Sequence, residues 1–337
     1  MLLAAFTPAS RSCWLPQRGF HASYPNFAKY RPMRQPLKVG AFTIPHSPAL
    51  PISQVPLEQL LESPKHNGSL IDDLRTLFTK NPATFYHGTS DFYTLKKNTR
   101  VPEICVLGRS NVGKSTLVNA IANRREKELA HTSSKAGRTR AMNAFGFGPA
   151  PTMKELADTS TEVKRTEDLP KHSLFIVDMP GYGHRSLKDW GRNINLYLHK
   201  RQSVKGAVVL IDGEVGPKST DLVALDLLCE AGVRTAIVLT KADKARDEAM
   251  LLNTCQELWN TLRDIQFKHL ESGWQWEKDI FVTAVGATKK EVGADTVDVA
   301  RLVIARLAGL VDEKVRPEQE AAKKYSGKIV SFDDLQY

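Results

Sequence analysis

Cysteine is scarce in this chain of 337 residues, which contains only Cys13, Cys105, Cys229 and Cys255. No two of them form a Cys-x-x-Cys pair or another metal-ligand spacing. This excludes a zinc site of that kind and a disulfide framework, and it indicates a reducing compartment. Long hydrophobic runs are absent too, since none approaches the roughly 20 residues that cross a bilayer. We therefore expect a soluble protein.

Acidic residues are missing from the first 57 positions, which hold six Lys or Arg and so contribute +6 to the net charge of +10. Residues 1–35 combine Arg with Ser and aromatic residues, a composition typical of a mitochondrial transit peptide. Residues 18–23 resemble a matrix-protease cleavage site, with the cut near Phe20. We predict a transit peptide and a location in the mitochondrial matrix. The alternative is a disordered basic tail.

Proline and polar stretches divide the rest of the chain. Five prolines between positions 45 and 64 break regular structure, and a short helix is predicted near 70–78, outside the main domain. The polar stretch at 148–172 is unusually long for a loop inside a domain, and it therefore indicates an insertion. The predicted organisation is a transit peptide over 1–35, a Pro-rich linker with a short helix over 36–84, a domain over 85–311 with the insertion at 148–172, and a polar C-terminal tail over 312–337.

The strongest motif is a phosphate-binding loop, Gly-Arg-Ser-Asn-Val-Gly-Lys-Ser, at residues 108–115. It fits G-x-x-x-x-G-K-[ST] and stands between a buried strand pattern at 104–107 and a helical pattern at 117–121, as the motif requires. Its backbone N–H groups can face phosphates, Lys114 adds a point charge, and the Ser115 hydroxyl can bind Mg²⁺. The residues assigned to the nucleotide here are Gly108, Arg109, Ser110, Asn111, Val112, Gly113, Lys114, Ser115 and Thr116.

A second motif, Asp-Met-Pro-Gly at residues 178–181, follows an apolar strand pattern at 173–177. Asp178 can hold Mg²⁺, usually through a water, and the Gly181 N–H can reach a γ-phosphate. Such a segment alone is a common turn. Its position at the end of a strand downstream of a phosphate loop favours the binding role.

Two further segments indicate which base is bound. In Thr240-Lys241-Ala242-Asp243, the Asp243 carboxylate can accept two hydrogen bonds from guanine N1 and N2, while the Lys241 stem can lie along the base. Adenine offers no such donor pair, and sites that hydrogen-bond a polar group reject analogues lacking it by about 10⁴ to 10⁵. The weaker segment Thr283-Ala284-Val285 could supply the Ala284 N–H to guanine O6. The ligand predicted is therefore GTP or GDP.

Apolar strand patterns alternate with amphipathic helical patterns, which predicts an α/β fold with a mostly parallel six-stranded sheet and helices on both faces. The four motifs follow strands in this pattern, so they meet at the edge where open α/β sheets bind ligands. This order of motifs resembles that of the GTPase superfamily of P-loop proteins with a Ras-like domain. The strands are expected at 104–107, 143–147, 173–177, 206–211, 235–239 and 280–283, and the helices at 114–122, 220–231, 246–269 and 297–310.

Within that superfamily, the motifs closely resemble those of the EngB family of TrmE–Era-like (TRAFAC class) P-loop GTPases. The resemblance covers about residues 85–310. Thr240 stands where many GTPases have Asn but agrees with the EngB pattern, while Thr283 replaces the usual Ser. The resemblance rests on the loop at 108–115, Gly-Arg-Thr at 137–139, Asp-Met-Pro-Gly-Tyr-Gly at 178–183 and Thr-Lys-Ala-Asp-Lys at 240–244.

The resemblance implies a GTPase that hydrolyses GTP to GDP and phosphate with Mg²⁺. It implies that Thr139 is a switch threonine that caps Mg²⁺ and the γ-phosphate, so Lys114, Thr139 and Gly181 would serve catalysis. The metal would then be held by Ser115, Thr139 and Asp178. It also implies a switch in large ribosomal subunit assembly, which a mitochondrial leader would place on the mitochondrial ribosome or in mitochondrial translation.

Two residues, Tyr182 and Asn111, bear on the rate of hydrolysis. Tyr182 stands where Ras-type enzymes use a water-orienting Gln, so we expect slow turnover that a partner accelerates, and a packing role for Tyr182. Several relatives with Asn at the position of Asn111 use it to help hold K⁺; the alternative is that Asn111 only stabilises the loop. Arg109 and Arg138 are expected to be solvated or to face RNA.

The partner expected is the mitochondrial large ribosomal subunit or its precursors, contacted through rRNA or ribosomal protein, with the protein itself a monomer. Two other functions remain open. One is a switch in RNA modification, although no appended modification domain is visible. The other is a membrane-associated or septum-associated process, although no amphipathic anchor is visible.

Overall fold

The fold is given by a computed structural model, which describes residues 42–44, 68–124, 128–131, 141–151, 170–182, 187–246, 248–285 and 290–311. All of them belong to the unit Pro36–Tyr337. The predicted transit peptide, the predicted tail, Arg138 and Thr139 lie outside the described residues, as do most of the predicted linker and of the insertion.

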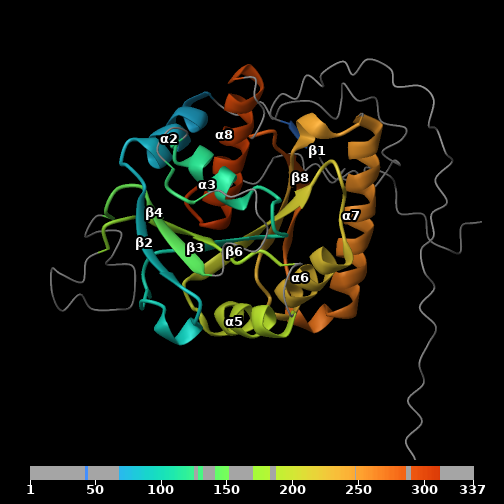
Figure 1. Cartoon of the computed structure of the whole chain (residues 1–337), viewed down its shortest axis with the longest axis horizontal. Helices are drawn as coiled ribbons and strands as arrows, with labels where there is room; N and C mark the ends of the chain where they lie inside the picture. Colours follow the sequence, from blue (N-terminus) through green and yellow to red (C-terminus); the bar gives the residue numbers. More distant parts are fainter. Residues whose placement is uncertain are drawn as a thin grey trace, which may run out of the picture. The chain divides into compact units, whose positions relative to one another are not determined.

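The described chain forms eight strands: β1 Phe42–Ile44, β2 Thr84–Thr89, β3 Glu103–Gly108, β4 Met142–Phe147, β5 Leu174–Asp178, β6 Val204–Asp212, β7 Thr235–Thr240 and β8 Trp276–Val282. They make one sheet in the order β1-β8-β7-β6-β3-β5-β4-β2 (Figure 1). The five strands from β8 to β5 are parallel, while β1, β4 and β2 are antiparallel to their neighbours. The parallel strands are almost continuously apolar because both of their faces are covered.

The sheet has two strands more than the six predicted. All six expected strands are present, and β1 and β2 add one at each edge. Strand β1 has only three residues, and β2 is exposed over its first half. The alternation in β1 is too short to be recognised as a strand in a sequence, and β2 shows neither a buried nor an alternating apolar pattern.

Six α-helices of the described chain pack on the sheet: α2 Gly68–Thr79, α3 Lys114–Ile121, α5 Leu187–Lys200, α6 Ser219–Glu230, α7 Glu248–Lys268 and α8 Lys290–Leu307. Helices α2, α3 and α8 cover one face, and α5, α6 and α7 cover the other (Figure 1). Each face therefore has its own apolar core. In the part of the chain that is described, no helix combines the length and apolar character that a membrane crossing needs.

Helix α2 belongs to the core of the domain, which corrects the prediction of a short helix outside it. Phe78 is fully buried and meets the ring of Phe147 edge-on at a centroid distance of 5.7 Å. Arg75 forms an ion pair with Asp298 of α8 at 2.7 Å. The partners of α2 are more than 60 residues away in the chain, so its local sequence could not show that it docks.

Candidate nucleotide-binding site

The loops that follow the parallel strands lie along one edge of the sheet, the edge at which open α/β folds bind ligands. Two of these loops are joined by Thr240, whose Oγ1 donates a hydrogen bond to the Val112 carbonyl at 2.8 Å. Thr240 is shorter than the Asn that many GTPases have here, yet it reaches the phosphate-binding loop. This hydrogen bond therefore connects the phosphate-binding loop to the base-recognition segment that begins at Thr240.

The backbone of the phosphate-binding loop needs special conformations. A Cβ at Gly108 would lie 2.7 Å from Val112 Cγ1 and 2.9 Å from the Leu210 carbonyl oxygen, so only glycine fits there. Gly113 has φ +107°, and Asn111 has φ +65°, a region that Asn tolerates better than most residues. The loop thus curls tightly at the start of α3, as a cradle of backbone N–H groups requires.

Lys114 lies folded over this loop. Its Nζ donates to the carbonyls of Gly108 at 2.9 Å and Arg109 at 3.0 Å. Burial lowers the pKa of Lys114, and the nearby Asp178 carboxylate opposes that shift. The buried Lys114 ammonium has lost most of its hydrating water. A bound anion would supply the contacts that it lacks.

Ser115 and Asp178 form the second polar pair. Ser115 Oγ donates to Asp178 Oδ2 at 2.9 Å, and Asp178 is 1% exposed. Burial raises the pKa of Asp178, while the charge of Lys114 and the Ser115 hydrogen bond oppose the rise. The other carboxylate oxygen, Oδ1, is buried without a hydrogen-bond partner among the described residues. A hydroxyl and an unsatisfied carboxylate oxygen are the oxygen ligands that Mg²⁺ prefers, so these residues fit that ion.

The segment after β5 lies directly against the phosphate-binding loop. A Cβ at Gly181 would come within 2.9 Å of Ser110 Oγ and 3.0 Å of Lys114 Nζ. The Ser110 N–H donates to the Tyr182 carbonyl at 3.1 Å. Gly181 therefore lies against the phosphate-binding loop, beside the Lys114 ammonium.

Tyr182 is packed inside the protein, in agreement with the packing role expected for it. It is 2% exposed, and its hydroxyl donates to Asp221 Oδ1 at 2.8 Å. Arg109 Nε pairs with Asp221 Oδ2 at 3.2 Å. The prediction that Arg109 is solvated or faces RNA was therefore wrong. A fully buried carboxylate needs a partner cation, and Arg109 supplies it.

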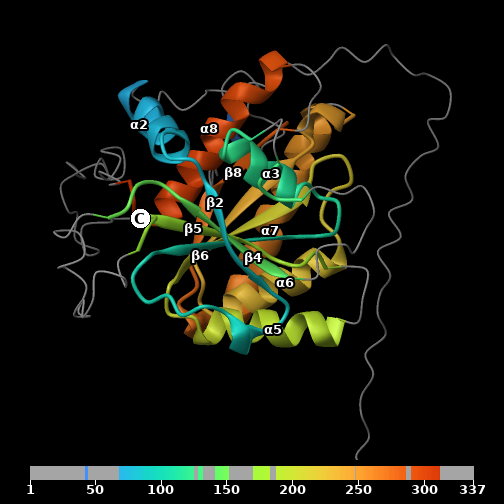
Figure 2. The same ribbon diagram turned by 60° about the vertical axis from the view of Figure 1, so that its left-hand side comes forward.

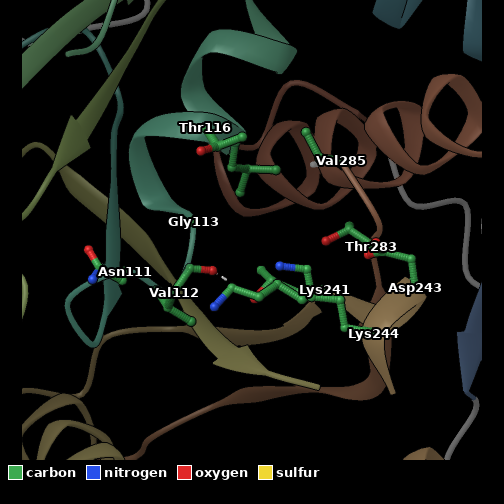
Figure 3. Close-up of a pocket in the computed structure, with 11 residues that line it drawn as sticks. Asn111, Val112, Gly113, Thr116, Lys241, Asp243, Lys244, Thr283 and Val285 are labelled. Carbon is green, nitrogen blue, oxygen red and sulfur yellow. Dashed lines mark hydrogen bonds between the residues drawn. The ribbon is translucent and has the colours of Figure 1, made fainter. Parts of the chain in front are cut away.

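At the other end of the site, the phosphate-binding loop and the base-recognition segments line one pocket (Figure 3). Asp243 lies in this pocket, and Ala284 is buried between the lining residues Thr283 and Val285. The sequence thus predicted residues from all three segments that the fold brings together. The lining is Asn111, Val112, Gly113, Thr116, Leu117, Thr240, Lys241, Asp243, Lys244, Thr283 and Val285.

Asp212 is a site residue that the sequence motifs did not indicate. Its Oδ2 pairs with Lys241 Nζ at 2.6 Å, and its Oδ1 accepts the Glu214 N–H at 3.0 Å. Lys241 itself has φ +55°, so the pair holds a residue in a strained conformation. Asp212 directly ends the apolar strand β6, as Asp178 ends β5. The rule that open α/β sheets bind ligands at the carboxyl ends of their strands could therefore have identified Asp212 as well.

Comparisons with known proteins agree with this geometry. The sequence model of a family described as 50S ribosome-binding GTPase matches residues 103–241. A probable GTP-binding protein EngB of Cereibacter sphaeroides is 37% identical over 185 residues, which cover 52% of this chain and 73% of that protein. One of Limosilactobacillus fermentum is 33% identical over 193 residues, covering 53% and 85%.

A solved structure titled as a probable GTP-binding protein engB aligns with 62% of this chain and 100% of its own, at 18% identity and a TM-score of 0.37. The assignment rests on the sequence relatives, which the chain covers over most of their length. This chain belongs to the EngB family of P-loop GTPases, which bind GTP or GDP with Mg²⁺ and hydrolyse GTP.

Proposed function

We propose that this GTPase is a slow nucleotide switch in the assembly of the large subunit of the mitochondrial ribosome. The observation that carries the switch is the contact of Gly181 and Tyr182 with the phosphate-binding loop, because a segment in that place senses whether a third phosphate is present. The family description as a 50S ribosome-binding GTPase supports the ribosomal partner. The acid-free, basic first 57 residues support the mitochondrial matrix.

In this proposal each part of the site has one task. The loop N–H groups and Lys114 hold the phosphates, and Asp243 and the Ala284 N–H read guanine. Ser115 and Asp178 hold Mg²⁺, with Thr139 as a third ligand in the GTP state. Bound Mg²⁺ neutralises charge that develops on the transferred phosphate, which is most of what this reaction asks of a protein.

Slow turnover follows from the position of Tyr182. Its hydroxyl is engaged by Asp221 at 2.8 Å, and burial together with the Asp221 charge raises the pKa of Tyr182 well above its usual value. A phenol held in this way does not accept a proton from the attacking water. Nor does it orient that water, which is the role of the Gln in Ras-type enzymes. The proposed accelerating group therefore comes from a partner or from a cation.

Asn111 is our candidate for holding that cation, K⁺, beside the phosphates. It lines the nucleotide pocket in a left-handed conformation. We expect faster GTP hydrolysis in KCl than in NaCl at equal ionic strength. Asn111→Gly, which tolerates the same φ without the amide, is expected to remove that difference. Equal rates of the unaltered protein in the two salts would show that Asn111 only shapes the loop.

Sedimentation of mitochondrial extract through a sucrose gradient tests the ribosomal role. We expect the protein to travel with large-subunit particles in a non-hydrolysable GTP analogue and to move to the top of the gradient in GDP, because the switch segments contact the third phosphate only in the first state. RNA sequencing of the fractions identifies the bound particle. Migration with free RNA-modifying enzymes or with membranes in both nucleotides would refute the proposal.

A further inference from the structure

We infer that the β2 edge of the sheet binds single-stranded RNA by base stacking, an inference that rests on the proposed ribosomal function. The edge surface is defined by Tyr86, Tyr93 and Lys96; Figure 2 turns β2 toward the viewer. Tyr86 is 36% exposed and Tyr93 is 67% exposed. Aromatic side chains at the surface and nearby cations are the groups that proteins use to stack unpaired bases and hold their phosphates.

The ring of Tyr86 is held in place from below. Tyr86 stands at an irregularity in the β2–β4 ladder, between Phe85 and His87, and its ring lies 4.6 Å from that of Phe175, tilted by 33°. Lys96 Nζ lies over the Tyr86 ring, 4.8 Å from its centre. A base that stacks here would take the place of the Lys96 ammonium over a pre-positioned ring, and the displaced ammonium is close enough to pair with the phosphate of that base.

Tyr93 is carried by the turn η2 Phe92–Thr94, which is tied to the same strand. The His87 ring Nε2 and the Thr94 carbonyl lie 3.1 Å apart. Since His87 and Thr94 directly follow Tyr86 and Tyr93, the two exposed rings stand on segments that are bonded together. Two rings on a fixed platform can receive bases of one strand without the ordering cost that loose side chains would carry.

The charge around the edge surface favours RNA over protein. Residues 80–100 contain four Lys or Arg and one acidic residue, Asp91. The irregularity at Tyr86 also interrupts the ladder, and such bulges disfavour the addition of a further strand from another chain. A polyanion with exposed bases matches both features, whereas an added β-strand matches neither.

Fluorescence anisotropy of the full chain with a labelled single-stranded RNA of mixed sequence tests this. Tyr86→Ala and Tyr93→Ala are each expected to weaken binding by about 10-fold, the loss of one stacked base. Tyr86→Phe, which keeps the ring, is expected to retain binding. Lys96→Ala is expected to lower the salt dependence of binding by about 0.7 in log–log slope, the value for one phosphate contact on a single strand.

Phe85→Ala is the matched control. Phe85 is 57% exposed on the same strand, but its ring contacts Phe145, which belongs to the core on the other face of the sheet from Phe175. Unchanged GTP affinity of each variant shows that it is folded. If only Tyr86→Ala loses GTP affinity, Tyr93→Ala decides whether the edge surface binds RNA, because the Tyr93 ring is mostly exposed.

Failure of this inference is distinct from failure of the ribosomal proposal. If Tyr86→Ala and Tyr93→Ala both bind RNA like the unaltered protein, or if Phe85→Ala weakens binding as much as they do, the edge surface is not the RNA site. The particles on the sucrose gradient would then still carry the protein if the ribosomal proposal is correct. Binding of duplex RNA with the same losses would overturn base stacking as the mode of recognition.

Discussion

Asp243→Asn is expected to move the nucleotide preference of this protein from guanine to xanthine. Asp243 lies in the turn η4 Ala242–Lys244, which is fixed by the hydrogen bond from the Ala242 N–H to the Thr283 carbonyl at 3.2 Å. An Asn amide there can still accept from N1–H, but its NH₂ group faces the donor at N2 of guanine. Xanthine presents a carbonyl at that position, which the amide can bind.

The size of the effect follows from the two hydrogen bonds. Bonds to a charged group contribute roughly 1.5–3 kcal/mol each, so GTP affinity is expected to fall by about 10² to 10⁴, with xanthosine triphosphate becoming the tighter ligand. Calorimetry with Mg²⁺ and each nucleotide measures both affinities. Asp264→Asn, at an exposed position of α7, is the control and should change neither. Full retention of GTP preference by Asp243→Asn would remove Asp243 as the residue that reads the base.

The parts of the site that the sequence predicted are those encoded by contiguous residues. The run from β3 through the phosphate-binding loop into α3 is local, because the apolar strand, the glycines and the helix follow one another directly. Asp178 and Asp243 each follow an apolar strand, and parallel strands bring their carboxyl ends to one edge. Local pattern plus this one rule of topology was enough to assemble them.

The features that the sequence did not predict depend on distant partners. The pairing of Arg109 with Asp221 joins residues 112 positions apart, and nothing near Arg109 indicates which carboxylate it meets. The docking of α2 and the two edge strands likewise depends on what covers them, since their own patterns are short or half exposed. Such contacts are set by packing of the whole domain and not by local propensity.

Lys114→Met is expected to leave the domain folded while abolishing its response to nucleotide. The folded protein bears a cost for keeping this cation buried, as the lowered pKa shows, so removing the charge offsets the loss of its hydrogen bonds to the Gly108 and Arg109 carbonyls. The apolar Met side chain has a similar length. We expect the free energy of unfolding without nucleotide to change by less than about 2 kcal/mol.

Thermal unfolding with and without GTP and Mg²⁺ measures the effect. A ligand at 100 times its dissociation constant stabilises the folded state by about 2.7 kcal/mol, and this shift is expected in the unaltered protein. It is also expected in Lys268→Met, which changes an exposed lysine of α7, but not in Lys114→Met. The phosphates lose the Lys114 ammonium that lies folded over their loop, and neighbouring backbone N–H groups cannot replace a full charge. A normal GTP shift in Lys114→Met would mean that the phosphates bind elsewhere.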